Sequence, residues 1–278
     1  RLANERRAFF RKTFVDEATG KTICSWYDAE RKGQLIDTQT SYALPLAFHV
    51  VDGDLQKKMA AHLAAAIKTP MAGYPAYSLL TGFIGTAWIS KALSDNGMSE
   101  EAYRLLQYEG YPSWLYPVKN GATTIWERLN SYTVKDGFGE NNSMNSFNHY
   151  SFGAVASWMY NYSLGICRDE KSPGFKHFIL KPEVDPTRGI THAEGYYDSM
   201  YGRISSRWQY TDSGIRYEFT VPANTTASLY LPAPAVSFIS ENGKPLKKAS
   251  GVRYVSADKE LHHLELASGS YQFDIKQK

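Results

Sequence analysis

Apolar residues in the first 165 positions recur every three or four residues, which is the spacing of helices that bury one face. The clearest run places an apolar side chain at every fourth position: Leu55, Met59, Leu63 and Ile67. We expect Asp54 to cap this helix and Pro70 to follow its end. Further helices are expected at the start of the chain and over 42–51, 85–96, 99–109 and 146–164. Helices that alternate with loops predict an array of antiparallel helix pairs.

The pattern changes after Gly165, where short runs begin with apolar residues at every second position. In the run 217–221 the apolar residues Tyr217, Phe219 and Val221 alternate with polar ones. Strands are expected over 175–180, 203–209, 215–221, 227–231, 252–255, 262–266 and 271–275. Residues 212–214 and 241–243 have the composition of hairpin turns. The pattern predicts an antiparallel β-sandwich, and it divides the chain into domains at 1–170 and 171–278.

Composition and charge narrow the class of protein. The 278 residues are 43% hydrophobic and 21% charged, as in a globular protein of one large or two ordinary domains. A net charge of +3 gives no reason to expect binding to nucleic acid or to an anionic membrane, and no apolar run is long enough to span a bilayer. Cys24 and Cys167 lack metal-site spacing, so a disulfide and two free thiols both stay open.

The candidate chemistry centres on the segment 111–128, which is interrupted by Pro and Gly in the manner of a functional loop. Glu127 directly follows Trp126 and directly precedes Arg128. Aromatic faces beside a carboxylate suit a sugar ring, and apolar surroundings raise the pKa of a carboxyl group because burial disfavours its charged form. The alternative is a surface Glu127 that forms an ion pair with Arg128.

Four sequence blocks then point to a known family. Residues 121–128 (GATTIWER), followed by 144–153 (MNSFNHYSFG), resemble the paired signature of bacterial α-L-rhamnosidases, glycoside hydrolase family 78. Residues 80–86 and 111–116 resemble two further stretches of that family in the same order. The resemblance implies that the chain holds the late helices of an (α/α)₆ barrel, followed by an antiparallel β-sandwich. Because the chain begins with Arg1, we interpret it as the C-terminal piece of a longer protein.

The resemblance also implies roles for individual residues. Enzymes of the family invert configuration at the sugar, and Glu127 stands at the position of their general base. His149 stands at the position of a family histidine that reaches the sugar; a histidine satisfied by a backbone group is the alternative. Trp114 and Trp126 are candidate walls of the sugar pocket, and core packing is the alternative for each.

The general acid is missing from this pattern. The family's acid lies in an Asp/Arg/Glu-rich motif upstream of these helices, and the chain contains no copy of it. Asp37, Asp136 and Glu140 are the spare carboxylates near the other candidates, and we interpret each as a solvated loop residue or cap. A chain with the base and without the acid should lose most catalysis, because acid assistance is worth about 10²–10⁴-fold.

The resemblance therefore predicts hydrolysis of terminal α-L-rhamnose from a glycoside or polysaccharide, with no cofactor and no metal required. Two other hypotheses stay open: another helical-barrel glycosidase with a different sugar, and a non-catalytic carbohydrate-binding fragment. The sequence leaves open the oligomeric state, the aglycone and the compartment, whether periplasmic, secreted or cytoplasmic.

Overall fold

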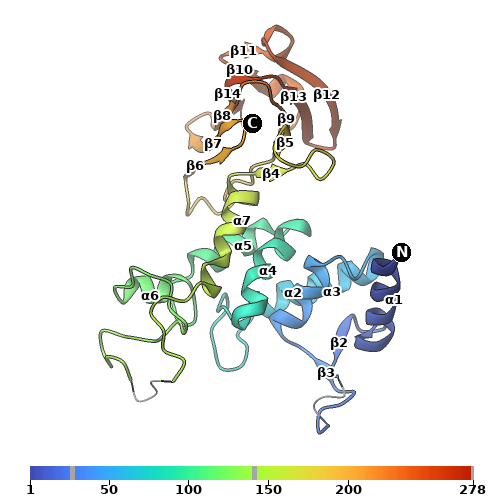
Figure 1. Ribbon diagram of the computed structural model, residues 1–278, viewed down its shortest axis with the longest axis vertical. Helices are drawn as coiled ribbons and strands as arrows, with labels where there is room; N and C mark the ends of the chain where they lie inside the picture. Colours follow the sequence, from blue (N-terminus) through green and yellow to red (C-terminus); the bar gives the residue numbers. More distant parts are fainter. Residues whose placement is uncertain (26–28, 140–142, 277–278) are drawn as a thin grey trace. The chain divides into compact units, whose positions relative to one another are not determined.

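The computed structural model describes residues 1–25, 29–139 and 143–276 (Figure 1). The chain forms two compact units, 1–155 and 156–278. The first consists of helices, long loops and one small three-stranded sheet, and the second consists mainly of two larger sheets. None of the described helices is both long enough and apolar enough to cross a membrane.

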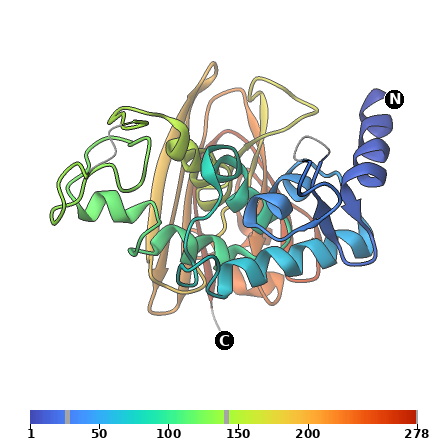
Figure 2. The ribbon, with the colours of Figure 1, turned by 90° about the horizontal axis from the view of Figure 1, so that it is seen from below.

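The helical unit contains the following elements: α1 (Leu2–Phe14), β1 (Val15–Asp16), β2 (Lys21–Ile23), β3 (Leu35–Ile36), α2 (Gln39–Ala47), α3 (Gly53–Lys68), α4 (Gly82–Asp95), α5 (Ser99–Gln107), α6 (Leu115–Lys119) and the 3₁₀-helix η1 (Ser151–Ala154). Helix α3, light blue in Figure 2, buries the predicted four-residue stripe together with Ala60 and Ala66. Helices α2 and α4 pack so closely that a Cβ atom on Gly85 of α4 would collide with the Thr40 Oγ1 of α2. The four-residue period in the sequence therefore identified the buried face of α3.

Helix ends differ from the sequence prediction where local hydrogen bonds decide them. Helix α2 begins after Thr38, whose side chain accepts a hydrogen bond from the Ser41 N–H in a capping box, and Pro45 consequently lies inside the helix rather than in its first turn. Asp52, not Asp54, is the N-cap residue of α3. Helix α5 begins at Ser99, as expected, and Met98 is its N-cap residue.

The prediction of one helix over 146–164 is wrong in its first part. Residues 146–149 run beside 125–127, and the His149 N–H donates to the Ile125 carbonyl at 2.8 Å. Helical structure begins only at Ser151, with η1, and continues through α7 (Val155–Trp158) and a π-helical turn (Met159–Ser163). Because those backbone groups are bonded to another segment, they are unavailable for helical hydrogen bonds.

The described residues of the second unit, 156–276, form eleven strands in two sheets: β4 (Ile166–Arg168), β5 (His177–Leu180), β6 (His192–Ser199), β7 (Gly202–Thr211), β8 (Gly214–Val221), β9 (Thr226–Pro232), β10 (Ile239–Glu241), β11 (Lys244–Pro245), β12 (Val252–Asp258), β13 (Leu261–Leu266) and β14 (Gly269–Lys276). The strand orders are β11-β10-β14-β8-β7-β6 and β12-β13-β9-β5-β4. Neighbouring strands are antiparallel except for β5 and β9, which are parallel. Every predicted strand is present, and the two predicted hairpin turns join β7 to β8 and β10 to β11.

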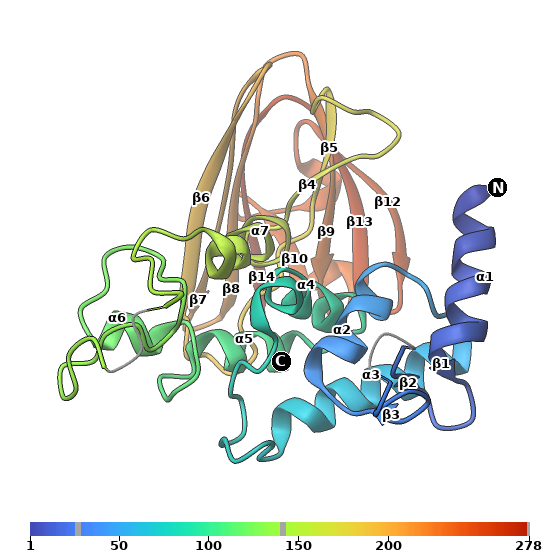
Figure 3. The same ribbon diagram turned by 60° about the horizontal axis from the view of Figure 1, so that its bottom comes forward.

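Alternate side chains of the two sheets make the core of this unit, and Figure 3 shows the sheets facing each other. Tyr217, Phe219 and Phe273 are buried from one sheet, and Leu229 and Leu264 from the other. The Tyr271 hydroxyl, from the six-stranded sheet, donates to backbone carbonyls next to the five-stranded sheet, at 2.8 Å for the nearer one. Strand β6 was missed in the sequence because none of its side chains is fully buried, and its apolar alternation is therefore absent.

The alternation predicts opposite outcomes for two adjacent residues of β14. Phe273 has no exposed surface and its ring lies 6.2 Å from that of Phe219, whereas Gln272 faces the other side of the sheet. Phe273→Ala should lower the free energy of unfolding by about 3–5 kcal/mol through lost burial and a cavity. Gln272→Ala should change it by less than about 0.5 kcal/mol. Urea denaturation of both variants tests this, and equal effects would contradict the assigned faces.

Candidate active site

A cavity of about 470 Å³ lies among the loops of the helical unit. Its lining residues come from four stretches that are distant in sequence: Tyr74, Leu79, Leu80, Gly82, Phe83, Tyr111, Pro112, Glu127, Arg128, Leu129, Asn130, Met144 and Phe152. Glu127 is the only acidic side chain among these lining residues. A carboxylate on the wall of a partly apolar cavity is a suitable arrangement for general acid–base chemistry.

Backbone hydrogen bonds hold Glu127 in place. Its N–H donates to the Ser146 carbonyl at 2.8 Å, and its carboxylate Oε2 accepts a hydrogen bond from the Ser146 N–H at 3.0 Å. A second backbone hydrogen bond, from the His149 N–H to the Ile125 carbonyl, joins the same two segments. The carboxylate is therefore fixed by main-chain groups, which move less than side chains.

The other carboxylate oxygen of Glu127, Oε1, accepts no hydrogen bond from the described residues and is available to a water molecule. Within the same described part of the chain, Glu127 forms no ion pair. Its sequence neighbour Arg128 instead directs its Nη2 to the Asn145 Oδ1 at 3.2 Å. The structure therefore does not contain the Glu127–Arg128 ion pair that was the alternative interpretation.

His149 is not among the residues that line the cavity, but its ring stacks on that of Phe83, which does line it, with centroids 4.8 Å apart. Its Nδ1 accepts a hydrogen bond from the Ser151 N–H at 3.4 Å, so the proton of a neutral ring is on Nε2. One ring nitrogen is thus hydrogen-bonded to a backbone group, which agrees with the alternative interpretation of this histidine. The other is left to donate a hydrogen bond, and contact of His149 with a sugar stays a prediction.

The two candidate tryptophans are packed in the interior. Trp114 is 8% exposed and its indole N–H donates to the Phe152 carbonyl at 2.8 Å. Trp126 is 6% exposed and packs edge-on against Phe147 and Tyr132. Neither lines the cavity. Both positions agree with core packing, which was the alternative for each, and sugar contact by either residue stays a prediction.

The spare carboxylates have structural partners. Asp37 forms an ion pair with Lys21 and accepts a hydrogen bond from the Tyr42 hydroxyl at 2.6 Å. These two hydrogen bonds, that from Lys21 foremost, lower the pKa of Asp37 below its usual value, so it is ionised at neutral pH and unsuited to act as a general acid. Asp136 bonds with Thr133 in a turn, and Glu140 lies outside the described residues.

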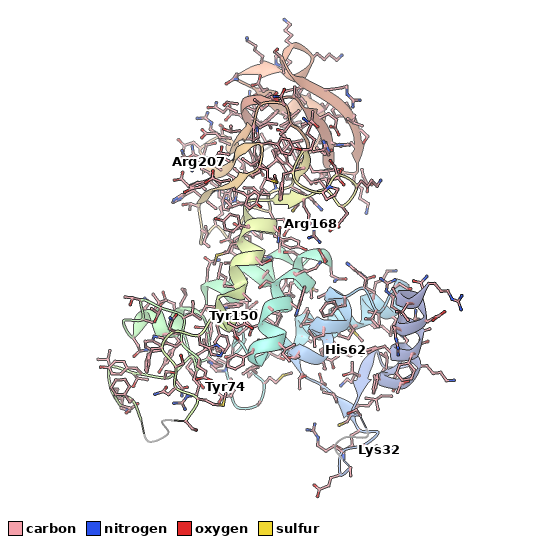
Figure 4. All side chains as sticks on the ribbon, viewed as in Figure 1. Lys32, His62, Tyr74, Tyr150, Arg168 and Arg207 are labelled. Atoms are coloured by element: carbon pink, nitrogen blue, oxygen red, sulfur yellow. The ribbon has the colours of Figure 1, made fainter. Side chains whose placement is uncertain are left out.

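Several residues of the cavity were not singled out as candidates in the sequence. The rings of Tyr74 and Tyr111 meet at 5.8 Å, and burial raises the pKa of the Tyr111 hydroxyl. Figure 4 labels Tyr74 on the loop that precedes α4. Tyr111 could have been found, because it begins the family-like block 111–116, but nothing in the sequence marks Tyr74. Among the described residues, no group of three or more His, Cys, Asp or Glu is placed to hold a metal ion.

Comparison with known proteins identifies the family. Residues 1–163 match the family model described as the bacterial alpha-L-rhamnosidase 6 hairpin glycosidase domain, and residues 165–245 match the bacterial alpha-L-rhamnosidase C-terminal domain. The chain belongs to the bacterial α-L-rhamnosidase family. The resemblance inferred from the four sequence blocks is thereby confirmed, as is the fold class of late six-hairpin helices followed by a β-domain.

Relatives of the family match nearly the whole chain. An alpha-L-rhamnosidase of Streptomyces avermitilis is 35% identical over 89% of the chain. The crystal structure of Streptomyces avermitilis alpha-L-rhamnosidase complexed with L-rhamnose superposes over 97% of the chain with a TM-score of 0.80, at 33% identity. The structure of alpha-L-rhamnosidase from Dictyoglumus thermophilum covers 99% of the chain with a TM-score of 0.79, at 26% identity. The chain spans only 22–28% of the length of these three relatives.

Substitution of the two tryptophans by phenylalanine tests the structural role of the Trp114 hydrogen bond. Trp114→Phe leaves the Phe152 carbonyl without its donor, so it should lower the free energy of unfolding by about 1–3 kcal/mol beyond the loss of volume. Trp126→Phe is the matched control, because the Trp126 indole N–H donates to none of the described residues. Thermal and urea unfolding measure both. Equal stability of the two variants would show that the Trp114 hydrogen bond contributes nothing.

Proposed function

We propose that this chain is the C-terminal part of an inverting α-L-rhamnosidase, which removes terminal α-L-rhamnose from a glycoside or polysaccharide. Glu127 is its general base, and its general acid comes from sequence upstream of this chain. The observation that carries the proposal is the geometry of Glu127, whose carboxylate is held by the Ser146 N–H on the wall of a 470 Å³ cavity. Membership of the family and the relatives' names support the choice of sugar.

The proposed reaction follows from the demands of inversion. Water must attack the anomeric carbon on the face opposite the leaving group, so the base and the acid stand roughly 6.5–9.5 Å apart to leave room for it. Glu127 Oε1 accepts the proton of that water while Oε2 stays bonded to Ser146. The upstream acid protonates the departing glycosidic oxygen. Water adds across the bond, α-L-rhamnoside yields β-L-rhamnose as the first product, and no redox step or cofactor is needed.

His149 and the aromatic residues have supporting roles in this proposal. His149 Nε2 donates a hydrogen bond to a sugar hydroxyl, and the stacked Phe83 ring fixes the plane of the imidazole. Trp114 and Trp126 contribute to the sugar pocket chiefly by holding the loops on which Glu127 stands. The domain division that accompanies this proposal is 1–170 for the barrel part and 171–278 for the β-sandwich.

Replacement of the base tests the catalytic assignment. In the full-length protein containing this chain, Glu127→Gln keeps the size of the side chain and the acceptor for the Ser146 N–H but removes the basic oxygen. We expect kcat on an aryl α-L-rhamnoside to fall about 10²–10⁴-fold with little change in KM. NMR of the first product of the wild-type enzyme should show β-L-rhamnose.

Three outcomes would contradict parts of the proposal. A first product of α configuration would exclude inversion. Cleavage of another sugar with no cleavage of rhamnosides would favour a different helical-barrel glycosidase. Sugar binding without turnover, unchanged by Glu127→Gln, would favour a non-catalytic carbohydrate-binding protein.

The backbone anchor of the base is tested by a pair of variants at one position. Ser146→Pro removes the N–H that holds Glu127 Oε2, whereas Ser146→Ala keeps it and is the control. We expect kcat of the proline variant to fall at least about tenfold below that of the alanine variant, because a misoriented base loses much of its effect. Melting curves of both variants check folding. Equal kcat values in two folded variants would exclude this positioning role.

A further inference from the structure

A second hollow lies far along the chain from Glu127, on the β6, β7, β8 and β14 strands of the six-stranded sheet. Its volume is about 690 Å³, and all of its lining residues belong to the β-unit. The core side chains of these strands point to the opposite side of the sheet. The hollow is therefore made by the outward-facing side chains, which the packing of the sandwich does not require.

The register of the strands explains why a trough forms there. Ser205, Thr220 and Ser270 are directly paired across β7, β8 and β14, so three short polar side chains stand in one row. The next outward row, two residues along each strand, consists of long polar side chains: Glu194, Arg207, Glu218 and Gln272. Short residues make the floor and long ones make a wall. With strands about 4.8 Å apart, the row from β6 to β14 is about 14 Å long.

Arg203, two residues before Ser205 on β7, stands on the opposite side of the floor, and an aromatic ring closes the β6 end. Tyr196 is paired with Ser205, at the end of the floor, and half of its surface is exposed. The Arg203 guanidinium lies over the Tyr196 ring at 3.7 Å from the centroid. Arg203 is itself held by two hydrogen bonds to the Asp198 carboxylate, at 2.8 and 3.1 Å. Arg203 and Tyr196 thus form a prearranged stack rather than a pair of loose surface side chains.

The charged wall is incompletely paired. Arg207 donates from Nη2 to the Gln209 Oε1 at 2.8 Å, but its buried Nε has no hydrogen-bond partner among the described residues. The carboxylates of Glu194 and Glu218 lie 3.6 and 3.7 Å from guanidinium nitrogens of Arg207, beyond good hydrogen-bond distance. The Arg207 side chain is 41% exposed, so the accessible part of its guanidinium can donate to a hydroxyl oxygen of a ligand. Figure 4 labels Arg207 on this sheet.

The balance of charge decides what kind of ligand fits. Two arginines and two glutamates line the trough, so their charges cancel and give no net attraction for an anion or a cation. The two carboxylates also repel an anionic ligand such as a phosphate or a uronate. The floor strands β7, β8 and β14 each pair with a strand on both sides, so their backbone groups cannot pair with an added peptide strand. Adjacent carboxylate, guanidinium, amide and hydroxyl groups match the vicinal diols of a sugar, and Tyr196 offers an apolar edge.

We propose that this trough, with Ser205, Thr220 and Ser270 as its floor, Arg207 on one side and Tyr196 at one end, is a non-catalytic binding site for a neutral oligosaccharide. It would hold an uncharged glycan chain by hydroxyl contacts over the width of four strands. The proposal does not depend on the assignment of Glu127, because the two sites share no residue. It adds to the hydrolytic site a second place at which the protein contacts glycan.

Filling the floor of the trough tests the proposal. The protein is the full-length polypeptide containing this chain, carrying Glu127→Gln so that probes are not consumed. The probes are neutral tetrasaccharides of rhamnose, glucose and mannose, with a tetragalacturonide as the anionic probe, and isothermal titration calorimetry measures binding. Thr220→Trp should raise Kd for the best neutral probe by about tenfold or more. Ser256→Trp, on an exposed position of β12 in the other sheet, should leave Kd unchanged.

A second, smaller change guards against misfolding. Gln272→Ala removes one wall amide and should weaken binding severalfold while the melting temperature stays that of the parent. The proposal is overturned if no neutral probe binds, if only the tetragalacturonide binds, or if Thr220→Trp binds the neutral probe as tightly as Ser256→Trp does. These results leave the hydrolytic assignment untouched, because that assignment is measured by the kcat of Glu127→Gln.

Discussion

The hydrogen bonds between the segments 125–127 and 146–149 are the constraint on which the candidate site depends. They join two stretches that lack regular secondary structure, and they satisfy backbone groups that would otherwise need water. The same bonds set the direction of the Glu127 carboxylate and place His149 against Phe83. The position of the Glu127 carboxylate is therefore fixed by pairing of main-chain groups rather than by a helix or strand.

The aromatic residues around this pairing act mostly as supports. Trp114 ties its own segment to the Phe152 carbonyl, and Trp126 packs among Tyr132 and Phe147. Each buries a large apolar area, which favours the fold more than a single polar contact could. Both tryptophans therefore support the loops around the cavity and do not line it.

Side-chain alternation along the strands of the β-unit produces both its core and the trough on its outer face. Alternation along each strand sends one set of side chains into the core, where Tyr217, Phe219 and Phe273 are packed, and leaves the other set on the outer face. Cross-strand register then decides which outer residues become neighbours. The row of Ser205, Thr220 and Ser270 forms a trough only because three strands are aligned at those positions. The same alignment keeps Arg207 between two glutamates.

Much of the architecture was contained in the order of residues. The period of four in 55–67 identified the buried face of α3, the period of two in 217–221 identified β8, and short sequence blocks identified the family. These features are local, so neighbouring residues suffice to specify them. Only the tertiary structure decided that 146–149 is not helical, that Tyr74 reaches the same cavity as Glu127, and that the two tryptophans are buried. Those outcomes depend on contacts between residues far apart in the chain, and no local spacing encodes which distant backbone group or ring will be the partner.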